Sequence, residues 1–110
     1  MPTYIQTGKM SEHTIRGLIE NPEDRFQAVS DLMAEAGATL KEYYFTTGDT
    51  DWMMIIEADS PDAAVAAAMV AGGSGAATGM STRQAWTSAE FKAVAAKAGQ
   101  IADKYREPGR

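Results

Sequence analysis

The chain has 110 residues, 45% of them hydrophobic and 23% charged, which is typical of one globular domain. It contains no cysteine, so disulfides, a thiol nucleophile and thiolate metal sites are excluded and a reducing compartment is favoured. The net charge is −5 and the basic residues are scattered singly, which argues against nucleic-acid binding. With no signal peptide or bilayer-length apolar stretch in the sequence, we expect a soluble cytoplasmic protein without a membrane partner.

The first part of the chain predicts one strand and two helical segments. Residues Thr3–Lys9 alternate loosely in polarity and are interpreted as a strand. Ser11 is a favoured N-cap for a short helix directly after it. Asn21 and Pro22 resemble an N-cap with proline at the first helical position, so we expect a second helix to begin there. Its buried face follows the i, i+3, i+4 spacing of Phe26, Val29, Leu32 and Met33.

The middle of the chain predicts a β-hairpin, a helix and a further strand. Leu40–Thr47 and Trp52–Glu57 are rich in aromatic, β-branched and other apolar residues, and they flank the turn-forming segment Gly48–Asp51. Ser60-Pro61 begins an alanine-rich helix, which the following run of glycines ends. Thr78–Trp86 is interpreted as the fourth strand.

The element order indicates the fold class. A last helix is expected from the capping box Thr87–Glu90 to about Tyr105. The order strand, helix, strand, strand, helix, strand is a split βαβ arrangement, here with an extra C-terminal helix. We therefore predict an α+β fold of ferredoxin-like βαββαβ type, with a four-stranded antiparallel sheet whose first and third strands are central. Residues 1–105 should form this single domain and residues 106–110 a flexible tail.

Both faces of the hairpin are apolar, which predicts a homodimer. The segment Trp52–Ile56 has five apolar residues in a row, although a strand with one face in water should alternate. A two-residue turn would pair Phe45 with Met54 on one face and Tyr44 with Ile55 on the other. The two main helices can cover only one face, so a second sheet from another copy would cover the other, forming a dimeric α/β barrel. The alternative is that the C-terminal helix folds across that face.

The chain resembles the GYD-domain family in three segments, in the right order and through about Ala98. These segments are Met1–Ile5, Tyr43–Asp51 with its apolar continuation, and Arg83–Phe91. In the family's turn a glycine is followed by any residue, an aromatic residue and an aspartate; Gly48 and Asp51 match, whereas Thr50 replaces the aromatic residue. The resemblance implies membership of the dimeric α/β-barrel proteins, in which two ferredoxin-like sheets pack face to face. It implies no settled activity, although related barrels include cofactor-free monooxygenases, cyclases and heme enzymes.

A few side chains are candidates for a functional site. His13 is the only histidine, and therefore the only side chain that titrates near neutral pH without perturbation. The candidates for a catalytic group are His13, Tyr4, Tyr43 and Arg83. Aromatic residues and the seven methionines suit an adaptable apolar pocket, which makes Tyr4, Tyr43, Trp52 and Trp86 the candidate ligand-binding residues. Packing in the core or in a dimer interface explains the same residues equally well.

Three other patterns are better explained by local structure than by binding. Asp49 and Asp51 could hold Mg²⁺ or Ca²⁺, but aspartates in tight turns more often accept bonds from nearby backbone amides. The run Gly72–Gly79 lacks the Gly-Lys-Ser/Thr ending of a phosphate loop and follows a helix rather than a strand. A heme would need His13 as its axial ligand, and a transition metal would have to rely on carboxylates. We therefore expect no metal site and no cofactor.

The sequence thus predicts a small homodimeric domain of the GYD type. Its expected partners are a second copy of the chain and a small apolar molecule held between sheet and helices. The alternative is a cofactor-independent monooxygenase or cyclase of the dimeric-barrel type, which would need one of the candidate polar groups inside an apolar pocket. The sequence leaves open whether the protein is an enzyme.

Overall fold

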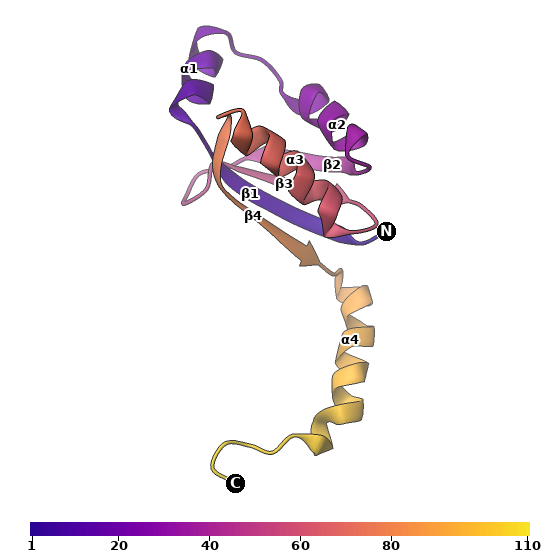
Figure 1. The fold of residues 1–110 in the computed structure, drawn as a ribbon. Helices are drawn as coiled ribbons and strands as arrows, with labels where there is room; N and C mark the ends of the chain where they lie inside the picture. Colours follow the sequence, from indigo (N-terminus) through magenta and orange to yellow (C-terminus); the bar gives the residue numbers. More distant parts are fainter.

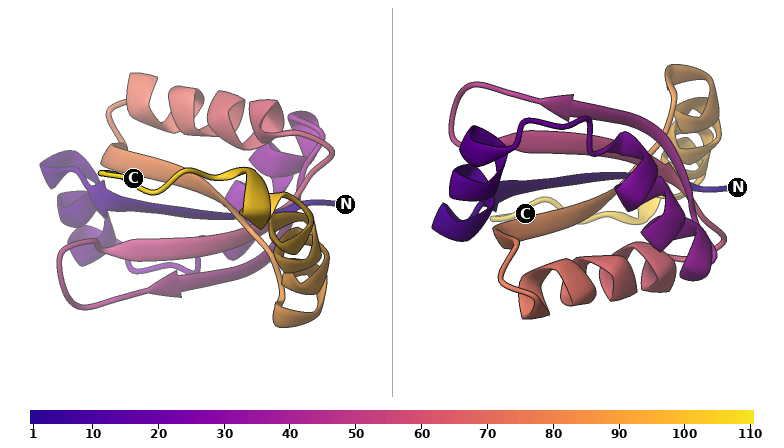
Figure 2. Two further views of the ribbon diagram at one scale, coloured as in Figure 1. Left: turned by 90° about the horizontal axis from the view of Figure 1, so that it is seen from below. Right: turned by 90° about the horizontal axis from the view of Figure 1, so that it is seen from above.

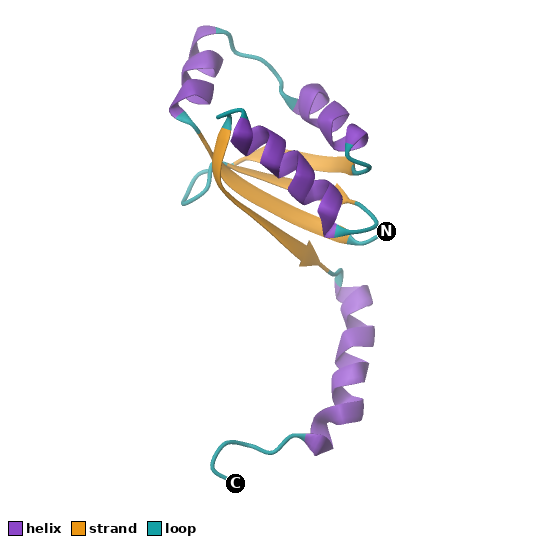
Figure 3. Cartoon of the chain, in the orientation of Figure 1, coloured by secondary structure: helices purple, strands orange, loops and turns teal.

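The computed structural model describes residues 1–110 and contains four strands and four α-helices (Figures 1 and 3). The strands are β1 (Thr3–Met10), β2 (Thr39–Phe45), β3 (Trp52–Glu57) and β4 (Ala77–Ala85). The helices are α1 (Glu12–Glu20), α2 (Phe26–Glu35), α3 (Pro61–Gly73) and α4 (Ser88–Ile101), and a 3-10 turn (Ala102–Lys104) follows α4. The strands form one antiparallel sheet in the order β2-β3-β1-β4. The ferredoxin-like α+β fold with β1 and β3 at the centre is therefore confirmed.

One face of the sheet is covered by helices and the other is open. α2 and α3 lie across the covered face and α1 stands at the end where β1 leaves the sheet (Figures 1 and 2). α4 projects from the end of β4 on the side of the open face, and every residue of α4 is exposed. The molecule is consequently elongated, with extents of 61 × 31 × 22 Å. The alternative considered above, in which the C-terminal helix of the same chain folds across the open face, is therefore wrong.

The core lies between the sheet and the covering helices. Trp52, Met54 and Ile56 alternate along β3 and all are buried, because every second side chain of a strand points to the same face. Small residues on α3, Ala64 and Ala67, are also buried and allow that helix to lie close to the sheet. None of the helices combines the length and the apolarity that a segment crossing a bilayer needs.

The hairpin register differs from the one expected from a two-residue turn. Phe45 pairs with Trp52 rather than with Met54, because a six-residue loop separates β2 from β3. The loop is closed by the amide of Thr46, which donates to the carbonyl oxygen of Asp51 at 2.8 Å. The shift is by two residues, so the side chains of Tyr43, Tyr44 and Phe45 keep their predicted faces. Leu40, expected on the same face as Tyr44, is instead buried in the core opposite Ile56, because the register shifts between Leu40 and Glu42.

The second helix begins later than the sequence predicts. Asn21 ends α1 instead of capping α2, with φ −143° and ψ 80°. Proline disfavours the helical conformation in the residue before it, so Pro22 breaks the chain of helical residues at that point. α2 then begins at Phe26, whose amide donates to the Asp24 carboxylate at 2.9 Å. The extended stretch between the helices separates α1 from α2, and both helices line a cavity above the sheet.

Candidate functional site

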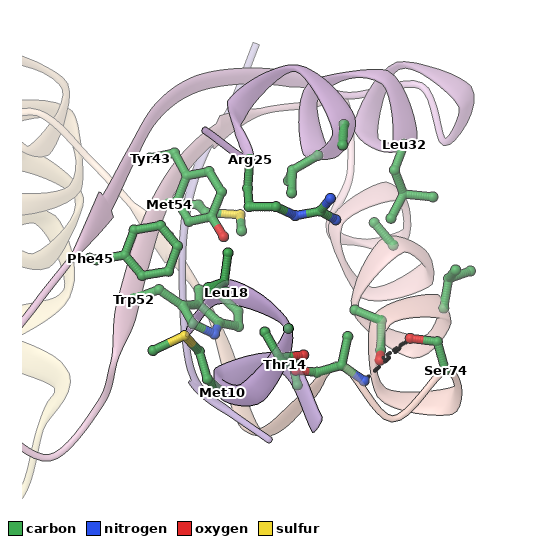
Figure 4. Close-up of a pocket in the computed structure, with 18 of the residues that line it drawn as sticks. Met10, Thr14, Leu18, Arg25, Leu32, Tyr43, Phe45, Trp52, Met54 and Ser74 are labelled. Carbon is green, nitrogen blue, oxygen red and sulfur yellow. Dashed lines mark hydrogen bonds between the residues drawn. The ribbon is translucent and has the colours of Figure 1, made fainter. Parts of the chain in front are cut away.

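A cavity of about 520 Å³ lies between the helices and the covered face of the sheet (Figure 4). Residues of α1, α2, α3 and all four strands line it, and 16 of its 24 lining residues are hydrophobic. Its volume falls within the ~300–1,000 Å³ that is usual for small-molecule sites. The apolar wall includes Met10, Leu18, Leu32, Phe45, Trp52 and Met54.

Tyr43 brings a hydroxyl group to this apolar cavity. Its side chain extends from β2 into the cavity, and its ring lies 5.0 Å from that of Phe45 (Figure 4). Burial raises the pKa of Tyr43 above the usual 10.0, and the charge of Arg25 offsets part of this increase. The phenol therefore stays protonated at neutral pH, where it can donate and accept hydrogen bonds but cannot act as a base.

Gln6 carries an amide oxygen that has no hydrogen-bond partner within the protein. Its side chain is 2% exposed, and its Nε2 donates to the carbonyl oxygen of Ala64 at 3.1 Å and to Oγ1 of Thr82 at 2.9 Å. The bond to the carbonyl oxygen fixes which amide atom is the nitrogen, because a carbonyl can only accept. The Oε1 of Gln6 then remains free. No fully buried side-chain oxygen lacks a partner, so this atom keeps access to the cavity that Gln6 lines.

The indole nitrogen of Trp52 is a matching free donor. Trp52 is 5% exposed and lines the cavity, and its Nε1–H makes no hydrogen bond within the protein. No fully buried side-chain atom lacks a partner, so this nitrogen keeps access to solvent, and a ligand that displaces the water must accept its hydrogen bond to avoid leaving it buried and unpaired. Tyr43, Gln6 and Trp52 thus offer a small set of donors and acceptors within apolar walls.

The mouth of the cavity carries charged side chains. Arg25 precedes α2 and its guanidinium reaches over the cavity, where Nη1 pairs with Oε1 of Glu23 at 2.7 Å (Figure 4). His13 on α1 also lines the cavity but is exposed. The pair between Arg25 and Glu23 is half-exposed, so it contributes little to stability and can open for an incoming ligand.

The structure brings together three of the residues singled out from the sequence. His13, Tyr43 and Trp52 come from α1, β2 and β3, and all three line the same cavity. Sequence analysis missed Gln6 and Arg25. A signal for Gln6 was present, because it is the one polar side chain on the covered face of β1, between Tyr4 and Gly8.

The other three candidates lie away from the cavity. Tyr4 is packed in the core and 3% exposed. Arg83 is exposed on the edge strand β4, opposite Ile5, on the open face of the sheet. Trp86 is 49% exposed and follows β4, where its ring meets that of Phe91 edge-on at 6.4 Å.

Of the two aspartates in the hairpin loop, Asp51 has a structural role. The carboxylate of Asp51 accepts a hydrogen bond from the amide of Met10 at 2.9 Å, and its own amide donates to the carbonyl oxygen of Gly8 at 2.8 Å. These two bonds hold the loop to β1, in addition to the bond from Thr46 that closes the loop itself. Asp49 is exposed and makes no side-chain hydrogen bond. No cluster of three or more side chains suited to a metal ion is present.

The glycine run after α3 ends that helix, as expected. Gly75 has φ +81°, a left-handed conformation that suits glycine at a helix end. The hydroxyl of Ser74 donates to the carbonyl oxygen of Ala71 at 2.8 Å, which satisfies one of the free carbonyls of the last turn. The run therefore terminates a helix and is not a phosphate loop.

Comparison with known proteins gives three results. Among solved structures, the chain is similar to one described as "crystal structure of FFRP-DM1", with 18% identity and a TM-score of 0.48, over 78% of this chain and 100% of that chain. No curated protein matches the sequence. The model of the GYD domain family matches residues 4–95, from β1 into α4. The chain therefore belongs to the GYD domain family.

Proposed function

We propose that this GYD domain is a homodimer that binds a small, largely apolar molecule in the cavity between the sheet and helices α1–α3. The observation that carries the proposal is that two polar atoms without a hydrogen-bond partner in the protein, Oε1 of Gln6 and Nε1 of Trp52, belong to residues that line the same apolar cavity as the protonated hydroxyl of Tyr43. Apolar walls with a few convergent polar groups are the usual character of a small-molecule site.

The cavity's chemistry specifies the kind of ligand. Sixteen apolar lining residues favour a hydrocarbon or aromatic body, since burial of apolar area is the main source of affinity. A ligand that displaces water from Oε1 of Gln6 should offer a donor in its place, and one that displaces water from Nε1 of Trp52 should offer an acceptor. A hydroxyl group can both donate and accept, so the ligand is an apolar molecule bearing hydroxyl or similar donor–acceptor groups.

The open face of the sheet supports the homodimer. Ile5, Met53 and Ile55 are only half-buried there, and Tyr44 is 49% exposed although it pairs with Met53. These four apolar side chains lie next to one another across β1, β3 and β2 and form a continuous patch at the centre of the sheet. No helix covers the patch, and a second copy of the same patch matches it in shape and polarity.

Charges at the margins of the patch suit a two-fold arrangement. Glu42 pairs with Ile55 and Arg83 pairs with Ile5, so the four side chains form one row with an acid at one sheet edge and a base at the other. A two-fold axis that runs along the strands between two facing sheets places each Glu42 over the partner's Arg83. Opposite charges at the rim of an interface favour this orientation over one that places like charges together.

Ligand binding is tested with 1-anilinonaphthalene-8-sulfonate, an apolar fluorescent probe, in the Trp86→Phe protein. Trp52 is then the sole tryptophan, and it lies at the cavity. We expect saturable energy transfer from Trp52 to the probe. Ala71→Leu fills part of the cavity and should weaken binding, whereas Ala66→Leu on the exposed side of α3 should not. Binding that is unsaturable, or equal in these two variants, would contradict the proposal.

A cofactor-independent monooxygenase or cyclase is the second candidate. The observation in its favour is that His13 and Tyr43 line the same cavity. An exposed histidine at the mouth and a protonated phenol are, however, better placed to hold a ligand than to abstract a proton from one. Oxygen consumption in the presence of a bound phenolic compound, abolished by His13→Gln, would establish the enzyme; a bound compound recovered unchanged supports binding alone.

A further inference from the structure

Helix α4 has an apolar side that nothing in its own chain covers. Phe91, Val94, Ala98 and Ile101 recur at intervals of three and four residues and therefore lie on one side of the helix. Phe91, Val94 and Ile101 are 51%, 41% and 60% exposed. We call these four residues the α4 stripe. An isolated helix of 14 residues is only marginally stable in water, so α4 requires a packing partner to remain folded.

The position of α4 indicates what that partner is. α4 leaves the end of β4 on the side of the open face and stands away from the sheet, as the side view and the view from below both show (Figures 1 and 2). At ~1.5 Å per residue its 14 residues extend about 21 Å. Face-to-face sheets lie ~10 Å apart, so a copy seated on the open face would have its own sheet and helices alongside α4.

The distribution of charge points to the same partner. Residues 88–110 carry five basic and three acidic side chains, a net charge of +2. Residues 1–87 carry five basic and twelve acidic side chains, a net charge of −7. A basic arm attached to an acidic body is complementary to the body of another copy, and the arm cannot satisfy that attraction within its own chain because it extends away from the sheet.

We propose that α4 crosses to the second copy of the dimer and packs its stripe against the body of that copy, so that each protomer is held by its partner's C-terminal arm. This inference rests on the homodimer proposed above. The exchange adds the apolar area of two stripes to the interface formed by the sheets. The edge-on pair of Trp86 and Phe91 lies where the arm begins and orients the first turn of α4.

Hydrogen exchange of the full chain, measured across a range of concentrations, tests the arm exchange. Below the dimer dissociation constant, amides in the part of α4 beyond its capped first turn should exchange nearly as fast as in an unfolded peptide, while those of β1 and β3 stay protected. Above it, protection of these α4 amides should rise by at least about tenfold. Protection that does not change with concentration, or an α4 that exchanges fast in the dimer, would overturn the proposal.

Two matched variants separate the stripe from the general charge of the arm. Val94→Asp places a carboxylate in the stripe, whereas Ala96→Asp adds the same charge on the opposite side of α4. We expect Val94→Asp to weaken dimerisation about tenfold, as for a typical interface contact, and Ala96→Asp to weaken it much less. Equal effects would contradict packing through the stripe. A wild-type protein that sediments as a monomer at every concentration overturns the homodimer itself, whereas a dimer with an unprotected α4 overturns only the exchange of arms.

Discussion

The indole ring of Trp52 lies against the α-carbon of Gly8, its cross-strand neighbour in the sheet. A β-carbon added to Gly8 would lie 2.8 Å from Cε2 and 2.9 Å from Cη2 of that ring, closer than packed atoms approach. The missing side chain at position 8 therefore makes the space in which the indole lies flat on β1. This contact fixes the wall of the cavity from which Nε1 of Trp52 is offered to a ligand.

The first prediction concerns this contact. Gly8→Ala should displace the indole and lower the free energy of unfolding in urea by about 1–3 kcal/mol, the usual cost of overpacking a core. It should also weaken binding of the apolar probe. Gly17→Ala is the control, because a β-carbon there meets nothing within 4 Å and alanine favours the helix by up to ~1 kcal/mol. Equal stabilities for the two variants would show that the indole does not rest on Gly8.

The second prediction concerns the tie between the hairpin loop and β1. Asp51→Ala removes the acceptor of the Met10 amide and should lower the free energy of unfolding by roughly 1–3 kcal/mol. Asp49→Ala, in the same loop but without a hydrogen bond, should change it by less than ~0.5 kcal/mol. Urea denaturation of both proteins checks this. A loop that tolerates both changes equally would mean that the Asp51 bond contributes nothing.

The third prediction concerns alkaline pH. Burial holds the pKa of Tyr43 above 10.0 in the folded protein, whereas the unfolded chain titrates at the usual value. Between these two pKa values the folded state binds more protons than the unfolded state. The contribution of Tyr43 to the free energy of unfolding is therefore complete below pH 10 and is lost as the pH rises through the folded pKa. Tyr43→Phe should lose this part of the decline, and Tyr105→Phe, at an exposed tail position, should not. Thermal melts between pH 8 and pH 11 provide the measurement; parallel curves for wild type and Tyr43→Phe would refute it.

The fourth prediction concerns the open face. Ile55→Asp places a carboxylate at the centre of the apolar patch and should weaken the dimer by roughly thirtyfold or more, the cost of ~2 kcal/mol typical of central interface residues. Its fold should be retained, because residue 55 faces away from the core. Ala66→Asp on the outer side of α3 should leave the dimer unchanged. Sedimentation velocity measures the dimerisation of both variants. An Ile55→Asp protein that stays dimeric would show that the interface lies elsewhere.

Local signals in the sequence were sufficient for most of the fold. The side chains of Ser11, Ser60 and Thr87 cap α1, α3 and α4 as predicted, and Glu90 completes the capping box by accepting from the Thr87 amide at 2.8 Å. Each of these motifs involves residues within three positions of one another. Chain order and the handedness rules then fixed the sheet with β1 and β3 at its centre.

The predictions failed where contacts between residues far apart in the sequence determine the structure. The hairpin register depends on Asp51, which is bonded to β1 some forty residues earlier, and a turn type inferred from four residues cannot include that bond. Gln6 bonds Thr82 across 76 positions, so its place in the alternation of β1 marks it as a polar residue on the covered face but does not reveal its partner. Arg25 reaches the cavity only because the segment after Pro22 is extended rather than helical.

Native mass spectrometry of the full chain, purified from its own host, tests the central claim most directly, because it reports subunit number and retained ligand together. The account predicts a dimer that carries one small molecule per chain. Ala71→Leu, which fills part of the cavity, should retain less of the molecule than the wild type, whereas Ala66→Leu should retain as much. Chains that are unliganded in all three proteins, or a ligand equally retained by both variants, would contradict binding in this cavity.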